Sequence, residues 1–209
     1  MNYIYYMWKF NPLEKNNINQ DVILHNLKFI ESHKIIIPMN LEEVINNDIF
    51  PELLELYNKI PSWVVKADLG RLLLIYSHSG IYSDVDCFIN KKFKNNNIIL
   101  FTEHICDSVH HLGPRECKNP DNVVRIANYF FGSTVKKHPF LKEVIEECLF
   151  RLNQLLNIEN NTNLNHQDIL WVCGPDVITT VYHRSKHKYN DITLYDNSYL
   201  THKCYGSWR

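Results

Sequence analysis

Residues 63–86 read WVVKADLGRLLLIYSHSGIYSDVD, and this stretch decides the fold. Its apolar first part predicts a helix from about 63 to 78. Gly80 is the residue type expected where such a helix ends in a left-handed cap. The β-branched and aromatic residues of 81–89 then predict a buried strand. A helix followed at once by a short apolar strand is typical of an α/β layer fold.

Four charged residues in this stretch are paired by these periodicities. Asp68 and Arg71 are three apart and share a face of the predicted helix. Asp84 and Asp86 are two apart, so on a strand both side chains leave the same face, about 6.6 Å apart along the chain. Two acids on one side of an apolar strand are costly unless a cation lies beside them. The alternative is that both acids simply end a strand in a solvated turn.

The cation that suits carboxylate oxygens best is Mg²⁺ or Mn²⁺, itself held by substrate phosphates. A metal beside a diphosphate acts as a Lewis acid on the leaving group, so Asp84 and Asp86 indicate transfer or departure of a phosphate.

The segments on either side continue the alternation of helices and strands. Upstream we expect a strand at 3–8, a helix at 20–33, a short buried strand at 35–37 and a helix at 51–59. Downstream we expect a strand at 98–101, an irregular loop over 102–122, a core-packed helix beginning at Pro139, and two more helix or strand segments with an aromatic tail over 168–209. The sequence therefore predicts one α/β domain over residues 1–209, a mixed sheet flanked by helices.

Composition and charge exclude several classes of protein. The 209 residues include twelve Tyr and ten Phe, enough apolar mass for a full core, and 22 basic against 23 acidic residues give no electrostatic case for binding nucleic acid or anionic lipid. No run of 18 apolar residues predicts a membrane span, and no secretory signal is seen. The six Cys show no CxxC spacing, which is typical of reduced thiols. We therefore expect a cytoplasmic protein, bacterial or, if viral, in the host cytoplasm.

The stretch 63–86 resembles the DXD-containing sugar-transferase family, which includes initiating α-1,6-mannosyltransferases, capsular polysaccharide transferases and, more distantly, clostridial toxin glucosyltransferases. The family pattern is a small residue before Asp, then Arg, an apolar helix, Gly-Gly-Ile-Tyr and Asp-x-Asp. Its counterparts here are Ala67-Asp68, Arg71, Ser79-Gly80-Ile81-Tyr82 and Asp84-Val85-Asp86. Serine replaces the first glycine of the pattern.

Matches outside this stretch come in the family's order. They are Tyr3 to Trp8 as the first strand, Asn128 followed by His138-Pro139, the turn Gly174-Pro175, and the tail His202-Lys-Cys-Tyr-Gly206-Ser207-Trp208. The resemblance thus extends from about residue 3 to 208.

The resemblance implies a GT-A fold and a retaining, metal-dependent transfer from a nucleotide-diphosphate sugar, UDP- or GDP-linked, to a glycan or other hydroxyl acceptor. It implies catalytic roles for Asp84, Asp86, Asp68 and Arg71, and metal ligation (Mn²⁺ or Mg²⁺) by Asp86 and His202. Donor contacts are implied for Trp8, Asp68, Arg71, Tyr82, Asp84, Asn128, Ser207 and Trp208, with Trp8 stacking on the base.

Three other hypotheses stay open on the sequence alone. A phosphoaspartyl hydrolase shares the apolar-Asp-x-Asp motif, but it needs Thr or Val where Phe88 stands. The loop from Glu103 to Cys117 has zinc-like residue types without regular ligand spacing. A degenerate transferase that binds a glycan or a partner without turnover is the main alternative, and metal-dependent turnover of a donor separates it from an enzyme.

Overall fold

The computed structural model describes residues 3–13, 17–41, 43, 51–94, 96–105, 124–159 and 163–204. Its centre is a mixed seven-stranded sheet. The strands are β1 (Tyr3–Met7), β2 (Ser32–Ile36), β3 (Gly80–Ser83), β5 (Ile98–Ile105), β6 (Val124–Ile126), β7 (Phe130–Ser133) and β8 (Ile192–Tyr195). Their order is β2-β1-β3-β7-β5-β6, with β8 paired to β5.

Both parallel and antiparallel pairs occur in this sheet. β1 runs parallel to β2 and to β3, and β8 runs parallel to β5, whereas β7 is antiparallel to both β3 and β5. A second, two-stranded sheet pairs β4 (Cys87–Ile89) with β9 (Leu200–His202) in antiparallel register. This small sheet brings the C-terminal part of the chain to the residues that follow β3.

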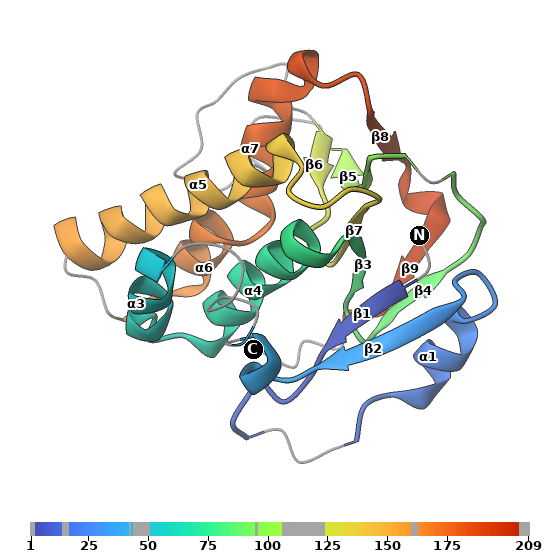
Figure 1. Cartoon of the computed structure of the whole chain (residues 1–209), viewed down its shortest axis with the longest axis horizontal. Coiled ribbons are helices and arrows are strands. Elements are labelled where there is room, and N and C mark those ends of the chain that lie inside the picture. The colour runs from blue at the N-terminus through green and yellow to red at the C-terminus, as the bar shows by residue number, and fades with distance from the viewer. Residues whose placement is uncertain are drawn as a thin grey trace.

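Helices cover the two faces of the large sheet unequally. On one side lie α3 (Pro51–Lys59), α4 (Trp63–His78), α5 (Pro139–Asn153), α6 (His166–Val172) and α7 (Pro175–Ser185). On the other side lie α1 (Gln20–Asn26) and the β4–β9 sheet (Figure 1). A π turn follows α5 at Gln154–Ile158, and single 3-10 turns occupy Lys186–Lys188 and Asn197–Tyr199.

The alternation of side chains along the strands divides the core into two clusters. Tyr5 and Met7 of β1 pack toward α4, α5 and α7, whereas Ile4 and Tyr6 pack toward α1 and β4. This two-sided burial explains the nearly continuous apolar character of the central strands, because a strand covered on both faces has no polar side.

Several predicted elements are confirmed. The strand at the N-terminus, the helices at 51–59 and 63–78, and the helix that begins at Pro139 all form within a residue of the predicted bounds. The prediction of a mixed sheet flanked by helices is confirmed as well.

Four predictions about neighbouring segments were wrong in extent. The helix expected over 20–33 ends at Asn26, because the chain turns there and enters β2 at Ser32. β2 is an exposed strand at the edge of the described sheet, where β1 is its neighbour, and not a buried one. β5 continues to Ile105, beyond the predicted 98–101, and the rest of the expected loop lies outside the described residues. The described residues from His166 to 204 hold two helices and two strands, more than the two segments expected over 168–209.

The strand predicted over 81–89 was also wrong, and this matters for the site. The chain leaves the large sheet at Ser83, turns through residues 84–86, and re-enters extended conformation at Cys87 in the other sheet. Asp84 and Asp86 therefore lie in a turn between two strands, so the strand-face argument for their common side does not hold.

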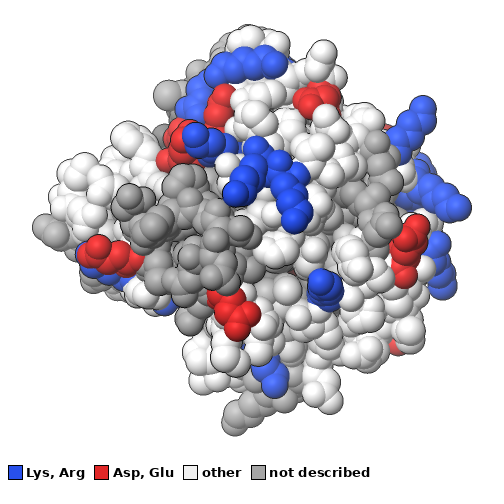
Figure 2. Space-filling model, in the orientation of Figure 1, with Lys and Arg blue, Asp and Glu red and all other residues white. Residues whose placement is uncertain are grey.

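The described helices include none long and apolar enough to cross a bilayer. On the face of the molecule seen in Figure 2, basic and acidic side chains of the described residues lie interspersed.

Candidate active site

The acidic turn lies at the carboxyl end of β3 and is held by backbone hydrogen bonds. The Asp84 N–H donates to the Tyr129 carbonyl over 2.8 Å, and the Cys87 N–H donates back to the Asp84 carbonyl over 3.2 Å. In addition, the Tyr82 hydroxyl donates to Asp84 Oδ1 over 2.5 Å. The turn is thus a fixed structure that presents Asp84 and Asp86 at the edge of the central sheet.

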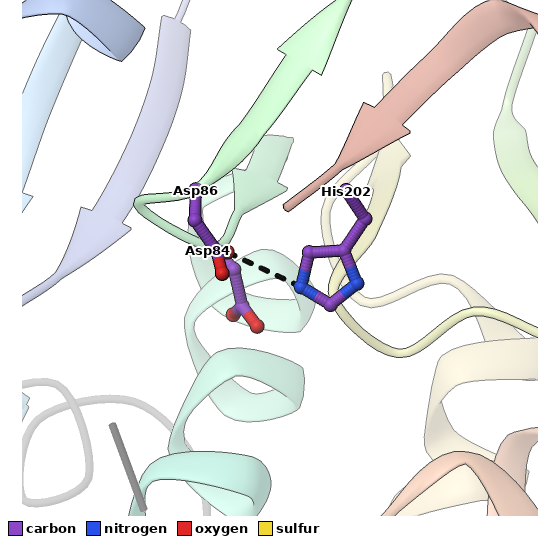
Figure 3. A group of neighbouring side chains, drawn as sticks. All are labelled: Asp84, Asp86 and His202. Carbon is purple, nitrogen blue, oxygen red and sulfur yellow. Dashed lines mark ion pairs between the residues drawn. The ribbon is translucent and has the colours of Figure 1, made fainter. Parts of the chain in front are cut away.

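His202 reaches this turn from the far end of the chain. In the β4–β9 pair Cys87 lies opposite His202, and the Lys203 N–H donates to the Asp86 carbonyl over 3.0 Å. His202 Nε2 lies 3.2 Å from Asp86 Oδ1 (Figure 3). One ligand atom from each of Asp84, Asp86 and His202 lies within 4.8 Å of the others. The backbone register of the small sheet is therefore what brings the imidazole to the two carboxylates.

Exposure and charge at this cluster suit a bound cation. The side chains of Asp84, Asp86 and His202 are 28%, 11% and 22% exposed, so a ligand can reach groups that are largely removed from water. Burial disfavours a charged imidazole, but the hydrogen bond and the charge of Asp86 raise the pKa of His202. Two carboxylates and one imidazole fit Mn²⁺ or Mg²⁺, with the remaining positions open to phosphate oxygens.

A buried ion pair lies directly behind the turn. Arg71 Nη2 lies 2.7 Å from Asp68 Oδ1, one helical turn earlier on α4, and Arg71 Nη1 lies 3.4 Å from Asp84 Oδ1. The guanidinium also donates to the Asn128 carbonyl over 3.0 Å, and it lies 4.6 Å from the centre of the Tyr82 ring. Arg71 is therefore the group that joins α4, the acidic turn and the segment before β7.

The two charges of this pair respond differently to burial. Burial raises the pKa of Asp68 to about 7, although Arg71 pulls it down. For Arg71, burial works in the opposite direction, but the carboxylates of Asp68 and Asp84 raise its pKa above its ordinary value. The guanidinium therefore stays charged, and Asp68 is the member of the pair that titrates near neutral pH. Among the described residues Arg71 Nε, which is buried, has no hydrogen-bond partner.

The structure brings together most of the residues that the sequence singled out. Asp68, Arg71, Tyr82, Asp84, Asp86, Asn128 and His202 form one connected cluster; the Asn128 amide donates weakly to Asp68 Oδ1, over 3.5 Å. Trp8 directly follows β1 and is half-buried; it packs against the hydrophobic core on the α1 side of the large sheet. Ser207 and Trp208 lie outside the described residues.

One neighbour of this cluster was not singled out from the sequence. Tyr129, between β6 and β7, stacks on the imidazole of His202 with 4.0 Å between ring centroids and 27° between planes. A tyrosine in an apolar segment carries no sequence signal for such a contact, because the two rings come from distant parts of the chain.

The fold, a mixed sheet flanked by helices, is GT-A-like. The solved structure named PaToxG Glycosyltransferase superposes with a TM-score of 0.53 over 88% of this chain and 68% of that chain, at 14% sequence identity, so this likeness concerns the fold alone.

Residues 5–104 match the family model described as "Glycosyltransferase sugar-binding region containing DXD motif". A protein named as an uncharacterized glycosyltransferase of Acanthamoeba polyphaga mimivirus is 26% identical over 168 residues, which cover 78% of this chain and 57% of that protein. A putative glycosyltransferase of Saccharomyces cerevisiae is 35% identical over 57 residues, 22% of this chain and 14% of that protein. The family model and both relatives support the DXD-containing sugar-transferase family, as the resemblance predicted. The chain spans little more than half the length of the mimivirus relative.

Proposed function

We propose that this chain is a retaining, divalent-metal-dependent glycosyltransferase that moves a sugar from a UDP- or GDP-linked donor to a glycan or other hydroxyl acceptor. The observation that carries the proposal is the convergence of Asp84, Asp86 and His202 beside the buried Arg71. The proposal takes residues 1–209 as one catalytic domain. The proposal that the sugar keeps its anomeric configuration rests on the resemblance to the family.

Asp84, Asp86 and His202 would hold the cation, Mn²⁺ or Mg²⁺. When bound, the cation supplies Lewis-acid stabilisation of the negative charge that develops on the departing nucleoside diphosphate. The protein's own part is to keep the three ligand atoms together, through the turn after β3 and the β4–β9 register, so that little reorganisation is needed on binding.

Asp68 and Arg71 would orient the donor sugar. A guanidinium offers several donors in a fixed plane, and that of Arg71 is itself fixed by Asp68, Asn128 and the Tyr82 ring. Because both side chains are largely shielded from solvent, the hydrogen bonds that they make to sugar hydroxyls would be stronger than in water. Orientation of the reacting carbon against the acceptor is where such a pair would contribute to rate.

The remaining donor contacts are proposed on the resemblance. Trp8 would stack on the base, Asn128 and Tyr82 would line the donor site, and Ser207 and Trp208 would cover the diphosphate and exclude water.

The experiment measures release of nucleoside diphosphate from a panel of UDP- and GDP-sugars, with Mn²⁺ or with a chelator. We expect release from one donor in Mn²⁺, none with chelator, and a loss of about 100-fold or more in Asp86→Asn. The matched control is Asp191→Asn, since Asp191 lies 3.1 Å from another imidazole, that of His138, outside the candidate site. This control should leave the rate unchanged. NMR of the product tests retention.

Absence of release from every donor, together with no donor-induced rise in melting temperature, would contradict the proposal. Donor-induced stabilisation without release would instead indicate the degenerate, binding-only alternative.

A further inference from the structure

Tyr129 lies between the acidic turn after β3 and strand β9, the two parts of the chain that supply the candidate metal ligands. It lies between β6 and β7, directly after Asn128, and is 8% exposed. Its backbone belongs to the segment that supports the acidic turn, and its ring faces the C-terminal strand β9 through His202. Tyr129 thus contacts the Asp84 backbone on one side of the site and the His202 ring on the other.

The ring contact adds to the polar contacts that hold the imidazole of His202. His202 occupies the end of a three-residue strand whose pairing, with β4, fixes the backbone but not the side-chain torsions. Stacking at 4.0 Å and 27° covers one face of the imidazole and limits its rotation. In this orientation Nε2 faces Asp86, and Nδ1 faces the Cys204 sulfur at 3.5 Å. Rotation of the ring would take Nε2 away from the carboxylates.

The backbone contact restrains the second ligand. The Tyr129 carbonyl accepts the Asp84 N–H over 2.8 Å and so anchors the turn at its first residue. Asp84, in the turn after β3, and His202, at the end of β9, are therefore held against the same residue.

We propose that Tyr129 is a positioning residue that orients His202, and with it Asp84, for binding of the divalent cation. The inference rests on the proposed function, because it concerns the same metal site. The orienting contact is made by the face of the Tyr129 ring and not by its hydroxyl group. Within the described part of the chain, that hydroxyl makes no hydrogen bond. Residues that orient metal ligands typically affect metal affinity by 10- to 100-fold when they are lost.

Binding of Mn²⁺ alone, measured by isothermal titration and by electron paramagnetic resonance of the free ion, tests this assignment. We expect Tyr129→Phe, which keeps the ring, to bind Mn²⁺ within about threefold of the wild type. Tyr129→Leu, which removes it, should bind about 10-fold more weakly or worse. The melting temperature of each variant is measured alongside. Tyr129→Met, a flexible side chain that fills space without a ring, replaces the Leu variant if the latter does not fold.

The matched control is Tyr189→Leu. Tyr189 also lies against a histidine, His138, with 5.6 Å between ring centroids, and its hydroxyl donates to Glu143. This variant should lose stability without losing Mn²⁺ affinity, which separates positioning from general destabilisation.

A folded Leu or Met variant with wild-type Mn²⁺ affinity would overturn the inference and leave the proposed function intact. A wild-type chain that binds no Mn²⁺, with Asp86→Asn indistinguishable from it, would overturn the metal site itself and this inference with it.

Discussion

The guanidinium of Arg71 lies 2.7 Å from the carboxylate of Asp68 on the same face of α4, with about a tenth of each side chain exposed. An i,i+3 pair on a solvated helix stabilises by only a few tenths of a kcal/mol. Here the pair is dry, and Arg71 has further contacts to the Asn128 carbonyl and to Asp84. Loss of either partner would leave a buried charge without its counter-ion. Because Arg71 also holds the Asn128 carbonyl and Asp84, the shape of its guanidinium matters as well as its charge.

Arg71→Lys keeps the charge but not the planar fork that spans these contacts. We expect the rate of donor turnover to fall by about 100-fold or more. The control is Arg151→Lys, because Arg151 is equally buried and has matching partners: Glu147, the Trp171 carbonyl and the Trp171 ring. Both variants should lose stability in urea denaturation, and only Arg71→Lys should lose turnover per folded molecule. Equal turnover in the two variants would count against a donor-site role for Arg71.

The raised pKa of Asp68 predicts a pH dependence of activity. Burial places this pKa at about 7, so below that pH the carboxyl is increasingly protonated and can no longer accept hydrogen bonds on both oxygens. Turnover should therefore rise with pH through about 7. Asp68→Asn, which is neutral at every pH, should be slower throughout and should lack this limb. A limb that persists unchanged in the variant would assign the titration to another group.

Tyr82→Phe removes one hydrogen bond from the acidic turn and leaves its packing intact. The Tyr82 hydroxyl donates to Asp84 Oδ1, while the ring lies under the Arg71 guanidinium. We expect a loss of about 1 kcal/mol in unfolding free energy and weaker Mn²⁺ binding by roughly 10-fold. Tyr82→Leu, which also removes the ring from Arg71, should be worse in both measurements. Mn²⁺ affinity equal to wild type in Tyr82→Phe would show that the hydroxyl does not orient Asp84.

The helix-borne part of the site was predictable from spacing, and the turn was not. Asp68 and Arg71 follow from i,i+3 geometry on a strongly apolar helix, which the structure forms as expected. The strand break at Ser83 has no Gly or Pro to mark it. It arises because the Asp84 N–H is taken by Tyr129 and because the next strand pairs with β9, which are both contacts between distant segments.

The approach of His202 to the acids likewise depends on long-range pairing. Periodicity says nothing about which strand will lie beside β4, so only the resemblance of the C-terminal tail pointed to His202. The early end of α1 has a similar cause. The buried Asn26 amide donates to the Cys87 carbonyl and accepts the Ile89 N–H, so the end of α1 packs against β4. None of these hydrogen bonds leaves a local signal in the sequence.

The entry into β3 stores backbone strain that two substitutions can reveal. Ser79 has φ 59° and ψ 179°, a region that is almost exclusive to glycine, and Gly80 follows with φ 106°. A β-carbon on Gly80 would lie 2.6 Å from Tyr5 Cε2 and 3.1 Å from the Tyr3 carbonyl oxygen. Gly80→Ala should therefore lower the unfolding free energy by about 2–3 kcal/mol, whereas Ser79→Gly should raise it by about 1 kcal/mol. Urea denaturation measures the free energy of unfolding of both variants. A Ser79→Gly variant less stable than the wild type would contradict the inference that the backbone at Ser79 is strained.

Glu143 on α5 should make stability depend on pH in the acid range. Burial opposes its ionisation, but hydrogen bonds from Ser185, Tyr189 and Lys188 prevail and lower its pKa below the ordinary 4.5. Since the native pKa is the lower one, its contribution to stability is complete above about pH 4.5 and is lost as pH falls through the native pKa.

Glu143→Gln should therefore be about 1 kcal/mol less stable than wild type at pH 7, with the difference closing as the pH is lowered toward 3. The control is Glu146→Gln on the same helix, whose carboxylate is more than half exposed and lies 3.5 Å from Lys142; it should differ little from wild type at either pH. Urea denaturation at pH 7 and at pH 3 measures the free energy of unfolding of both variants. A Glu143→Gln deficit that stays constant from pH 7 to 3 would show that the lost stability comes from packing and not from the carboxylate's charge.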